Sequence, residues 1–185
     1  MSSTKKEPKK PSEHVNYSLD LPGKITFEFL KSHLWSAADI LRGSLDPSEY
    51  RQPVMTLLFI KRLNDTFEEN AEKLIIQGKN QKEAYENKIR HEFFIPKEAR
   101  WSVLSSASEN MGEKIDHVCR VIERENPDLD GVLTNTKYND KRKYPDDKLR
   151  KLISHFNSPS LRNSDLVMAS LHYPYYSLIT TDYQE

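Results

Sequence analysis

The sequence predicts an all-α protein, a multi-helix bundle with a disordered N-terminal tail and irregular, aromatic-rich connections. Apolar residues make up 36% of the 185 residues and charged residues 30%, a balance typical of amphipathic helices with solvated outer faces. Apolar side chains also recur at steps of three and four residues through most of the chain. The length suffices for one domain with a core.

The N-terminal segment, residues 1–22, is expected to be a disordered basic tail. It holds four lysines and three prolines but no apolar run, so it predicts neither a secretory signal nor a membrane span. A cytoplasmic protein without membrane contact is therefore expected. The 28 basic and 28 acidic residues cancel, so binding to nucleic acid would require a local patch.

The helical bundle is expected over residues 23–166. A first helix follows from Phe27, Leu30, Leu34, Ala37, Ala38 and Leu41, with Gly43 as its terminator. Asp46 before Pro47 predicts the N-cap of a long second helix that ends near Gly78, in which Pro53 must fall within the first turns. Because this second helix is apolar on several sides, we expect a central strut rather than the short recognition helix of a DNA-reading helix-turn-helix.

Three shorter helices are predicted further along the chain. One covers about residues 81–89, and another runs from Met111 to Glu125 until Asn126 and Pro127 close it. The last starts near Asp146 and places Leu149, Leu152, Ile153 and Phe156 on one face. Between them, residues 91–101 read as an irregular connection pinned by aromatic side chains, and residues 128–147 as a polar loop.

Four ordered blocks of sequence resemble one known family. They are LWSAADILRGSLDPSEYRQPVMTLLFIKRLND at 34–65, FFIPKEARWSVL at 93–104, NMGEKIDHVCRVIERENPDLDGVL at 110–133 and DDKLRKLISHFNS at 146–158. All four are similar to the N-terminal helical domain of the modification subunit of type I restriction-modification systems, which are adenine-N6 DNA methyltransferases. The resemblance spans about residues 25–166.

The resemblance implies a role in assembly. In such proteins this domain helps to join the subunit to the specificity subunit and to close around DNA, and a restriction subunit completes the complex. A second, Rossmann-like domain binds S-adenosylmethionine and holds the flipped adenine in an Asn-Pro-Pro-aromatic loop. We therefore expect a DNA-clamping assembly domain that neither binds S-adenosylmethionine nor methylates alone.

Residues 167–185 depart from the family pattern and are expected to be a separate tail. The nearest match to the catalytic tetrapeptide, Tyr173-Pro174-Tyr175-Tyr176, follows His172 where the family has an Asn or Asp, so we do not expect catalysis from it. The five glycines are isolated, so no Gly-rich cofactor loop is predicted. The break suggests a truncated or frame-shifted reading of a longer gene, or a split subunit, and predicts a methyltransferase domain in the DNA beyond residue 166.

Other chemistry is not predicted. The six histidines do not fall at metal-ligand spacing, and the single cysteine, Cys119, lies in an apolar helical pattern that predicts a core position. Asp116 beside His117 is read as a solvated helix pair, and Glu68, Glu69 and Glu72 as outward-facing side chains.

Two basic features are the candidates for binding. Lys61 and Arg62 lie on the long helix, and Lys141, Arg142 and Lys143 lie in a run of seven basic and three acidic residues over 137–151. Such side chains bind phosphate without reading bases, although a solvated face is the more common role for any one of them. Tyr138 and Tyr144 interleave with the second feature, which favours nucleic-acid binding slightly. The alternative function is a stand-alone helical nucleic-acid-binding or regulatory protein derived from the same domain.

Overall fold

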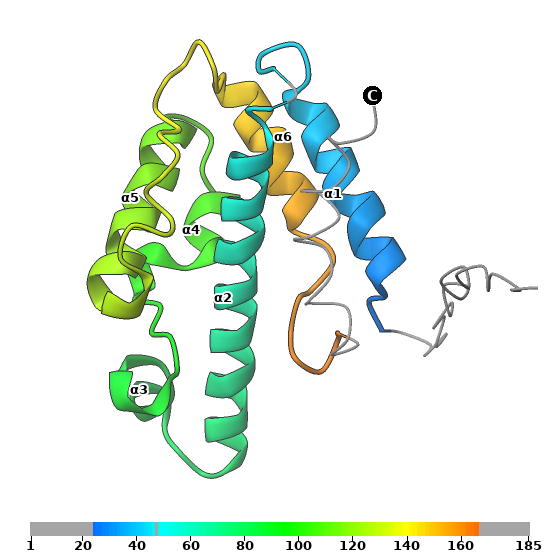
Figure 1. The fold of residues 1–185 in the computed structure, drawn as a ribbon. Coiled ribbons are helices and arrows are strands. Elements are labelled where there is room, and N and C mark those ends of the chain that lie inside the picture. The colour runs from blue at the N-terminus through cyan, green and yellow to red at the C-terminus, as the bar shows by residue number, and fades with distance from the viewer. Residues whose placement is uncertain (1–23, 47, 167–185) are drawn as a thin grey trace, which may run out of the picture.

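The computed structural model describes residues 24–46 and 48–166, and these residues form the predicted all-α bundle (Figure 1). The helices are α1 (Phe27–Leu41), α2 (Arg51–Ile76), α3 (Gln81–Glu86), α4 (Trp101–Ser105), α5 (Met111–Glu125) and α6 (Asp146–Phe156), with 3-10 turns η1 (Lys88–Arg90), η2 (Lys97–Ala99) and η3 (Pro127–Leu129). In these two ranges, β pairing is limited to isolated bridges, Ile25 with Leu166 and Arg42 with Leu45. The two predicted tails lie outside the described residues.

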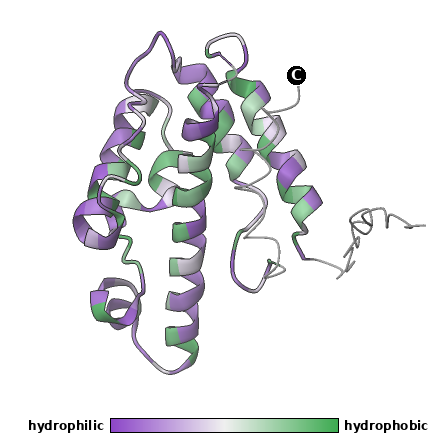
Figure 2. Ribbon diagram, viewed as in Figure 1, coloured by the Kyte–Doolittle hydropathy of each residue, from purple (hydrophilic) through white to green (hydrophobic). Residues whose placement is uncertain are grey.

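Helix α2 is the axis of the bundle. Its N-terminal half is surrounded by α1 and α6 on one side and by α4 and α5 on the other, whereas α3 packs against its C-terminal half (Figure 1). The hydropathy follows this arrangement, because the turns of α2 inside the bundle carry green, apolar residues and the lower turns are mostly purple (Figure 2). The prediction that α2 is a central strut is confirmed.

The ends of α1 follow ordinary capping rules, and Gly43 lies just past its C-terminus as predicted. Thr26 caps the N-terminus, where its hydroxyl oxygen accepts a hydrogen bond from the Phe29 amide at 3.3 Å. After Leu41 the chain turns through Gly43, whose φ of +83° is a left-handed conformation that glycine adopts without strain. The sharp break between α1 and α2 is thus built from ordinary capping chemistry.

Two helix boundaries differ from the predictions, and one short helix was not predicted. Asp46 is not the N-cap of α2, because its backbone forms a separate turn with Glu49 and the helix begins only at Arg51. Pro53 then falls within the first turn, as the sequence requires. The helix predicted over 81–89 ends at Glu86, and α4 was not predicted because its five residues are too few to show a period.

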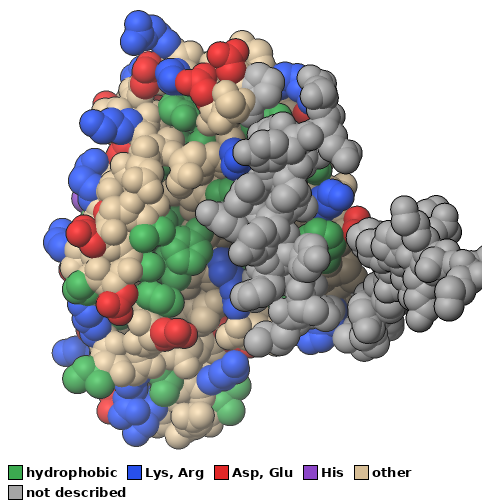
Figure 3. Space-filling model, in the orientation of Figure 1, with side chains coloured by type: hydrophobic (Ala, Val, Ile, Leu, Met, Phe, Trp, Pro, Cys, Tyr) green, Lys and Arg blue, Asp and Glu red, His purple; other side chains and the backbone are tan. Residues whose placement is uncertain are grey.

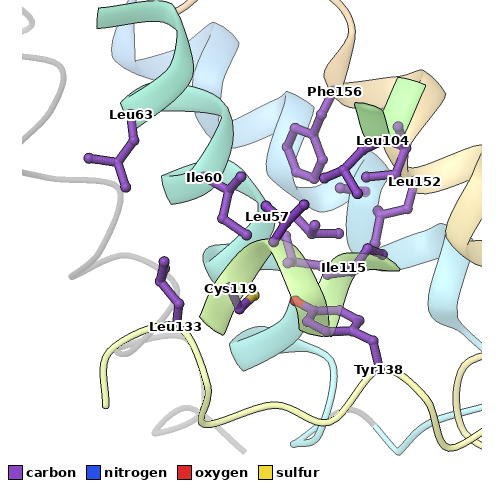
Figure 4. Packing of buried hydrophobic residues seen from close by; sticks show 14 of the residues in the cluster. Leu57, Ile60, Leu63, Leu104, Ile115, Cys119, Leu133, Tyr138, Leu152 and Phe156 are labelled. Atoms are coloured by element: carbon purple, nitrogen blue, oxygen red, sulfur yellow. The ribbon is translucent and has the colours of Figure 1, made fainter. Parts of the chain in front are cut away.

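One hydrophobic cluster joins all the long helices (Figure 4). Leu57 and Ile60 of α2 meet Ile115 of α5 and Phe156 of α6, each 1% exposed or less. Cys119 belongs to the same cluster, as the sequence predicts, and burial raises the pKa of its thiol to about 12. Its thiol is therefore a core group and not a reactive one.

Candidate nucleic-acid interface

The polar connection between α5 and α6 is held on α5 by carboxylates. Glu123 accepts the backbone amides of Leu133 at 2.6 Å and Thr134 at 2.9 Å, and also the Thr134 hydroxyl at 3.0 Å. Hydrogen bonds to an ionised acceptor are about twice as strong as neutral ones. The first half of the connection is therefore fixed in place rather than loose.

Asp116 fixes the second half in the same way. Its two carboxylate oxygens accept the consecutive amides of Tyr138 at 2.8 Å and Asn139 at 3.2 Å. Asp116 is only 7% exposed, so the prediction of a solvated Asp116–His117 pair is wrong for the aspartate, while His117 does face solvent. Buried carboxylates persist where amide donors satisfy them, which is the case here.

Backbone contact adds a third anchor. A Cβ atom on Gly112 of α5 would lie 2.1 Å from the carbonyl oxygen of Tyr138 and 2.9 Å from the Cα of Asn139. No real Cβ makes contacts this short, so the loop approaches α5 only because residue 112 is glycine. A glycine inside an otherwise good helix was the available signal for this close approach.

The two tyrosines of the connection point inward. Tyr138 is fully buried and donates its hydroxyl to the Pro53 carbonyl at 2.7 Å, and its ring centroid lies 5.3 Å from that of Tyr144, which is also buried. Burial raises the pKa of both phenols. The expected contribution of these tyrosines to base stacking is thus corrected, because their rings belong to the core.

The loop ends at a cap shared by two helices. Asp146, at the start of α6, accepts the backbone amides of Asn110 at 3.0 Å and Met111 at 3.1 Å, which lie at the start of α5. Helix N-termini leave such amides unpaired, and a carboxylate there is favoured by the helix dipole. Both ends of the connection are thereby tied to the bundle.

This anchored segment, residues 137–143, presents basic side chains outward and is called the basic loop below. Lys141 and Arg142 are exposed, and the Arg142 side chain retains 93% of its accessible surface beside Asp140. Lys143 reaches Glu49 at 2.5 Å, and this contact lowers the pKa of Glu49 and raises that of Lys143. In Figure 3, Lys and Arg side chains are spread along the edge of the molecule formed by the loop and α5.

The other basic residues of the run serve local contacts. Lys148 donates to the Arg42 carbonyl at 2.6 Å, and Arg150 to the Ser108 carbonyl at 2.9 Å. Lys151 faces Asp147 at 3.8 Å on the same helix. Lys148 and Arg150 thus connect α6 to its neighbours.

The structure places Lys61 and Arg62 elsewhere. Lys61 is 5% exposed, forms an ion pair with Asp65 and lies 5.8 Å from the centroid of the Trp101 ring. Arg62 donates to the Leu161 carbonyl and to the Asn163 side chain, and its burial lowers the pKa of the guanidinium. Both cations are committed to contacts within the bundle, and neither of these contacts involves the basic loop.

The segment after α6 is bound by acidic residues of α2. Asp65 accepts the amide of Leu161 at 2.6 Å, and Glu69 accepts those of Asn163 at 2.8 Å and Ser164 at 3.2 Å. Glu69 is 6% exposed, so the prediction that it faces outward is wrong. Burial acts to raise its pKa, but hydrogen bonds from Lys73 and Asn163 outweigh that effect and hold it below the usual value.

The described residues offer no fit for a nucleotide-type cofactor or a metal ion. Their glycines serve turns with positive φ, at Gly43, Gly78 and Gly131, or the contact of Gly112 with the basic loop. None of these positions provides the Gly-rich turn that S-adenosylmethionine binding requires. Residues 24–46 and 48–166 contain no group of three metal-ligating side chains, nor a helix with the length and apolarity needed to cross a bilayer.

These features define a class of protein: an all-α bundle domain whose surface carries an anchored basic loop. The chain belongs to the HsdM N-terminal domain family, whose model matches residues 30–156. It therefore contains the N-terminal domain of a type I methyltransferase subunit, and the resemblance seen in the four sequence blocks is confirmed. In this family S-adenosylmethionine is used by the catalytic domain. No curated protein matches the chain.

Proposed function

We propose that this domain assembles a type I DNA methyltransferase complex and helps to close it around DNA. The observation that carries the proposal is the basic loop: a connection rich in Lys and Arg is held on α5 by Asp116, Glu123 and the close contact at Gly112. A preorganised set of cations loses little conformational entropy when it meets phosphate. Membership of the family supports the partners that we propose, a specificity subunit and a restriction subunit.

The five basic residues predicted as contacts divide into two groups under this proposal. Lys141, Arg142 and Lys143 meet DNA or the specificity subunit from the basic loop. Lys61 and Arg62 act indirectly. Lys61 pairs with Asp65, which accepts the Leu161 amide, and Arg62 itself donates to the segment after α6. A substitution in the first group should change binding, and one in the second group should change stability.

Methyl transfer is assigned to the catalytic domain of the complete subunit. That domain supplies the S-adenosylmethionine site, so the described residues contribute assembly and DNA contact only. Calorimetric titration of the 185-residue chain with S-adenosylmethionine should give no heat of tight binding. A tight complex would refute this part of the proposal.

The rival is a stand-alone helical nucleic-acid-binding or regulatory protein, which the exposed cations of the basic loop also favour. Co-purification with a specificity subunit, followed by DNA binding with and without that subunit over a salt series, separates the two. Assembly predicts a stable subunit complex and DNA binding at about 0.15 M salt only in that complex. Equal, salt-dependent binding by the chain alone favours the rival.

A matched pair of variants tests the role of the loop. Arg142→Gln removes an exposed cation of the basic loop, whereas Arg124→Gln removes one on α5 that pairs with Glu125 at 3.0 Å. We expect Arg142→Gln to weaken DNA binding by the subunit complex and to lower the slope of log affinity against log salt by about one. Arg124→Gln should leave both unchanged, and equal effects would contradict the assignment.

A further inference from the structure

A polar pocket lies between α5 and the start of the basic loop. Its lining residues are Asp116, Cys119, Arg120, Thr134, Thr136, Lys137 and Asn139. Arg120 comes from the exposed face of α5 and Lys137 from the loop, so two cations from different elements flank one hollow. An arginine fork and a lysine point charge on the same hollow suit an anion with several oxygens.

Both cations are unpaired in the described part of the chain. Neither the Arg120 nor the Lys137 side chain takes part in an ion pair or hydrogen bond among those residues. Arg124, one turn further along α5, contrasts with them because it pairs with Glu98 at 3.6 Å and with Glu125 at 3.0 Å. The pocket therefore carries positive charge that nearby carboxylates do not take up.

The carboxylate in the pocket wall, that of Asp116, already has hydrogen-bond partners. Both oxygens of Asp116 accept backbone amides, those of Tyr138 and Asn139, and Glu123 beside the pocket is satisfied by the amides of Leu133 and Thr134. These amide donors satisfy the hydrogen-bonding capacity of both carboxylates, which therefore do not pair with the two cations. The same hydrogen bonds fix the backbone next to Lys137 against α5, the helix that carries Arg120.

We infer that this pocket binds one phosphate of a DNA backbone, with Arg120 and Lys137 as its cationic walls and the Asn139 side chain beside them. The inference deepens the proposed function, on which it rests, because Lys141 and Arg142 follow Lys137 in the same loop. A DNA strand that crosses the loop would place one phosphate in the pocket and the next ones near those side chains. Such contacts position the duplex and read no bases.

The test is an amide-shift titration of the full chain by heteronuclear NMR at low salt. The two probes are a short mixed-sequence DNA duplex and inorganic phosphate alone. With the duplex we expect shifts at residues 134–139 and at the Arg120 side chain, and a loss of affinity of about threefold to tenfold in Arg120→Gln and in Lys137→Gln. Arg124→Gln is the matched control and should bind as the unaltered chain does.

Each outcome decides the inference. Duplex-induced shifts at the pocket that weaken in both variants support it. Absence of shifts at 134–139, or equal weakening by Arg124→Gln, overturns it, and equal affinity for inorganic phosphate overturns DNA as the source of the anion. Assembly with the specificity subunit is measured separately by co-purification, so the proposed function can stand when the pocket fails, or fail when the pocket binds.

Discussion

Gly112 and Tyr138 meet backbone to backbone, so close that a Cβ on residue 112 would lie 2.1 Å from the Tyr138 carbonyl oxygen. This contact lets the basic loop lie flat on α5, while the Tyr138 ring enters the core and its hydroxyl reaches α2. A surface feature and the hydrophobic core are therefore coupled through one residue pair. A substitution at position 112 should therefore affect both the basic loop and the packing of the core.

Gly112→Ala tests that coupling. Alanine normally stabilises a helix interior relative to glycine, but here the new methyl group would collide with backbone atoms that cannot move without losing the hydrogen bonds of Asp116. We expect a net loss of about 1 to 3 kcal/mol in the free energy of unfolding, measured in urea. His117→Ala, on the exposed face of α5, should stay within about 0.5 kcal/mol. A more stable Gly112→Ala protein would show that the backbone at Tyr138 leaves room for a methyl group on residue 112.

Asp116→Asn should loosen the basic loop but keep one of its two hydrogen bonds to this side chain. The amide side chain retains one acceptor oxygen but turns an NH2 group toward a backbone amide that previously donated to Asp116. Leaving one buried donor unsatisfied costs about 1 to 3 kcal/mol. Hydrogen exchange should become faster at Tyr138 and Asn139 first. Unchanged protection of those two amides, with Glu113→Gln as the control, would argue against the anchoring role of Asp116.

The helices could be predicted because their signals are local. The bounds of α1 and α5 follow from three- and four-residue spacing with Thr26, Gly43 and Pro127 near their ends, and the core face of α6 was predicted in full. The predictions failed where a side chain forms hydrogen bonds with a segment that is distant in the sequence. Asp116 and Glu69 look like surface acids until the segments near 138 and 163 fold back to donate amides to them.

The candidate site could be predicted only in part for the same reason. The basic run over 137–151 is visible in the sequence, but the burial of Tyr138 depends on α2, which lies 85 positions earlier at Pro53. The pocket between Arg120 and Lys137 joins a helix to a loop, and no spacing rule predicts that meeting. Lys61 and Arg62 resemble a surface pair in sequence, although their partners are Asp65 and residues 161–163.

Lys61→Met should lower stability far more than a matched surface change. Lys61 and Asp65 form a nearly buried pair at i,i+4 spacing, with 7% and 14% of their side chains exposed. Removing the lysine leaves the carboxylate with the hydrogen bond from the Leu161 amide but without its ion pair, so we expect a loss of about 2 to 4 kcal/mol in urea unfolding. Lys73→Met breaks the equally spaced pair with Glu69, but Lys73 is 56% exposed and the loss should stay below about 1 kcal/mol. Equal losses would show that burial does not govern these pairs.

The stacked rings of His33 and His155 predict a pH dependence of stability. Their centroids lie 3.8 Å apart between α1 and α6, and the Nε2 of His155 donates a hydrogen bond to the His33 carbonyl at 2.9 Å. Burial, and then the charge of His155, lower the pKa of His33 from 6.5 to about 4. The buried Nε2 of His33 has no hydrogen-bond partner within the described residues, so a proton there would find no acceptor.

Proton linkage gives the direction in which stability changes with pH. Above about pH 6.5 His33 is neutral in both the folded and the unfolded state. Between about pH 6.5 and 4, His33 is protonated in the unfolded chain but stays neutral in the folded protein, so unfolding becomes easier as the pH falls. Because the ring is only half-buried, we expect a loss of about 1 to 2 kcal/mol across this window. His33→Phe keeps an aromatic ring against His155 and removes the titration, so urea unfolding over this range should show a flatter profile. Burial also lowers the pKa of His91, but this residue is present in both proteins, so its effect cancels in the comparison. His117→Gln, at an exposed position, should reproduce the unaltered profile, and a His33→Phe profile as steep as that one would place the acid sensitivity elsewhere.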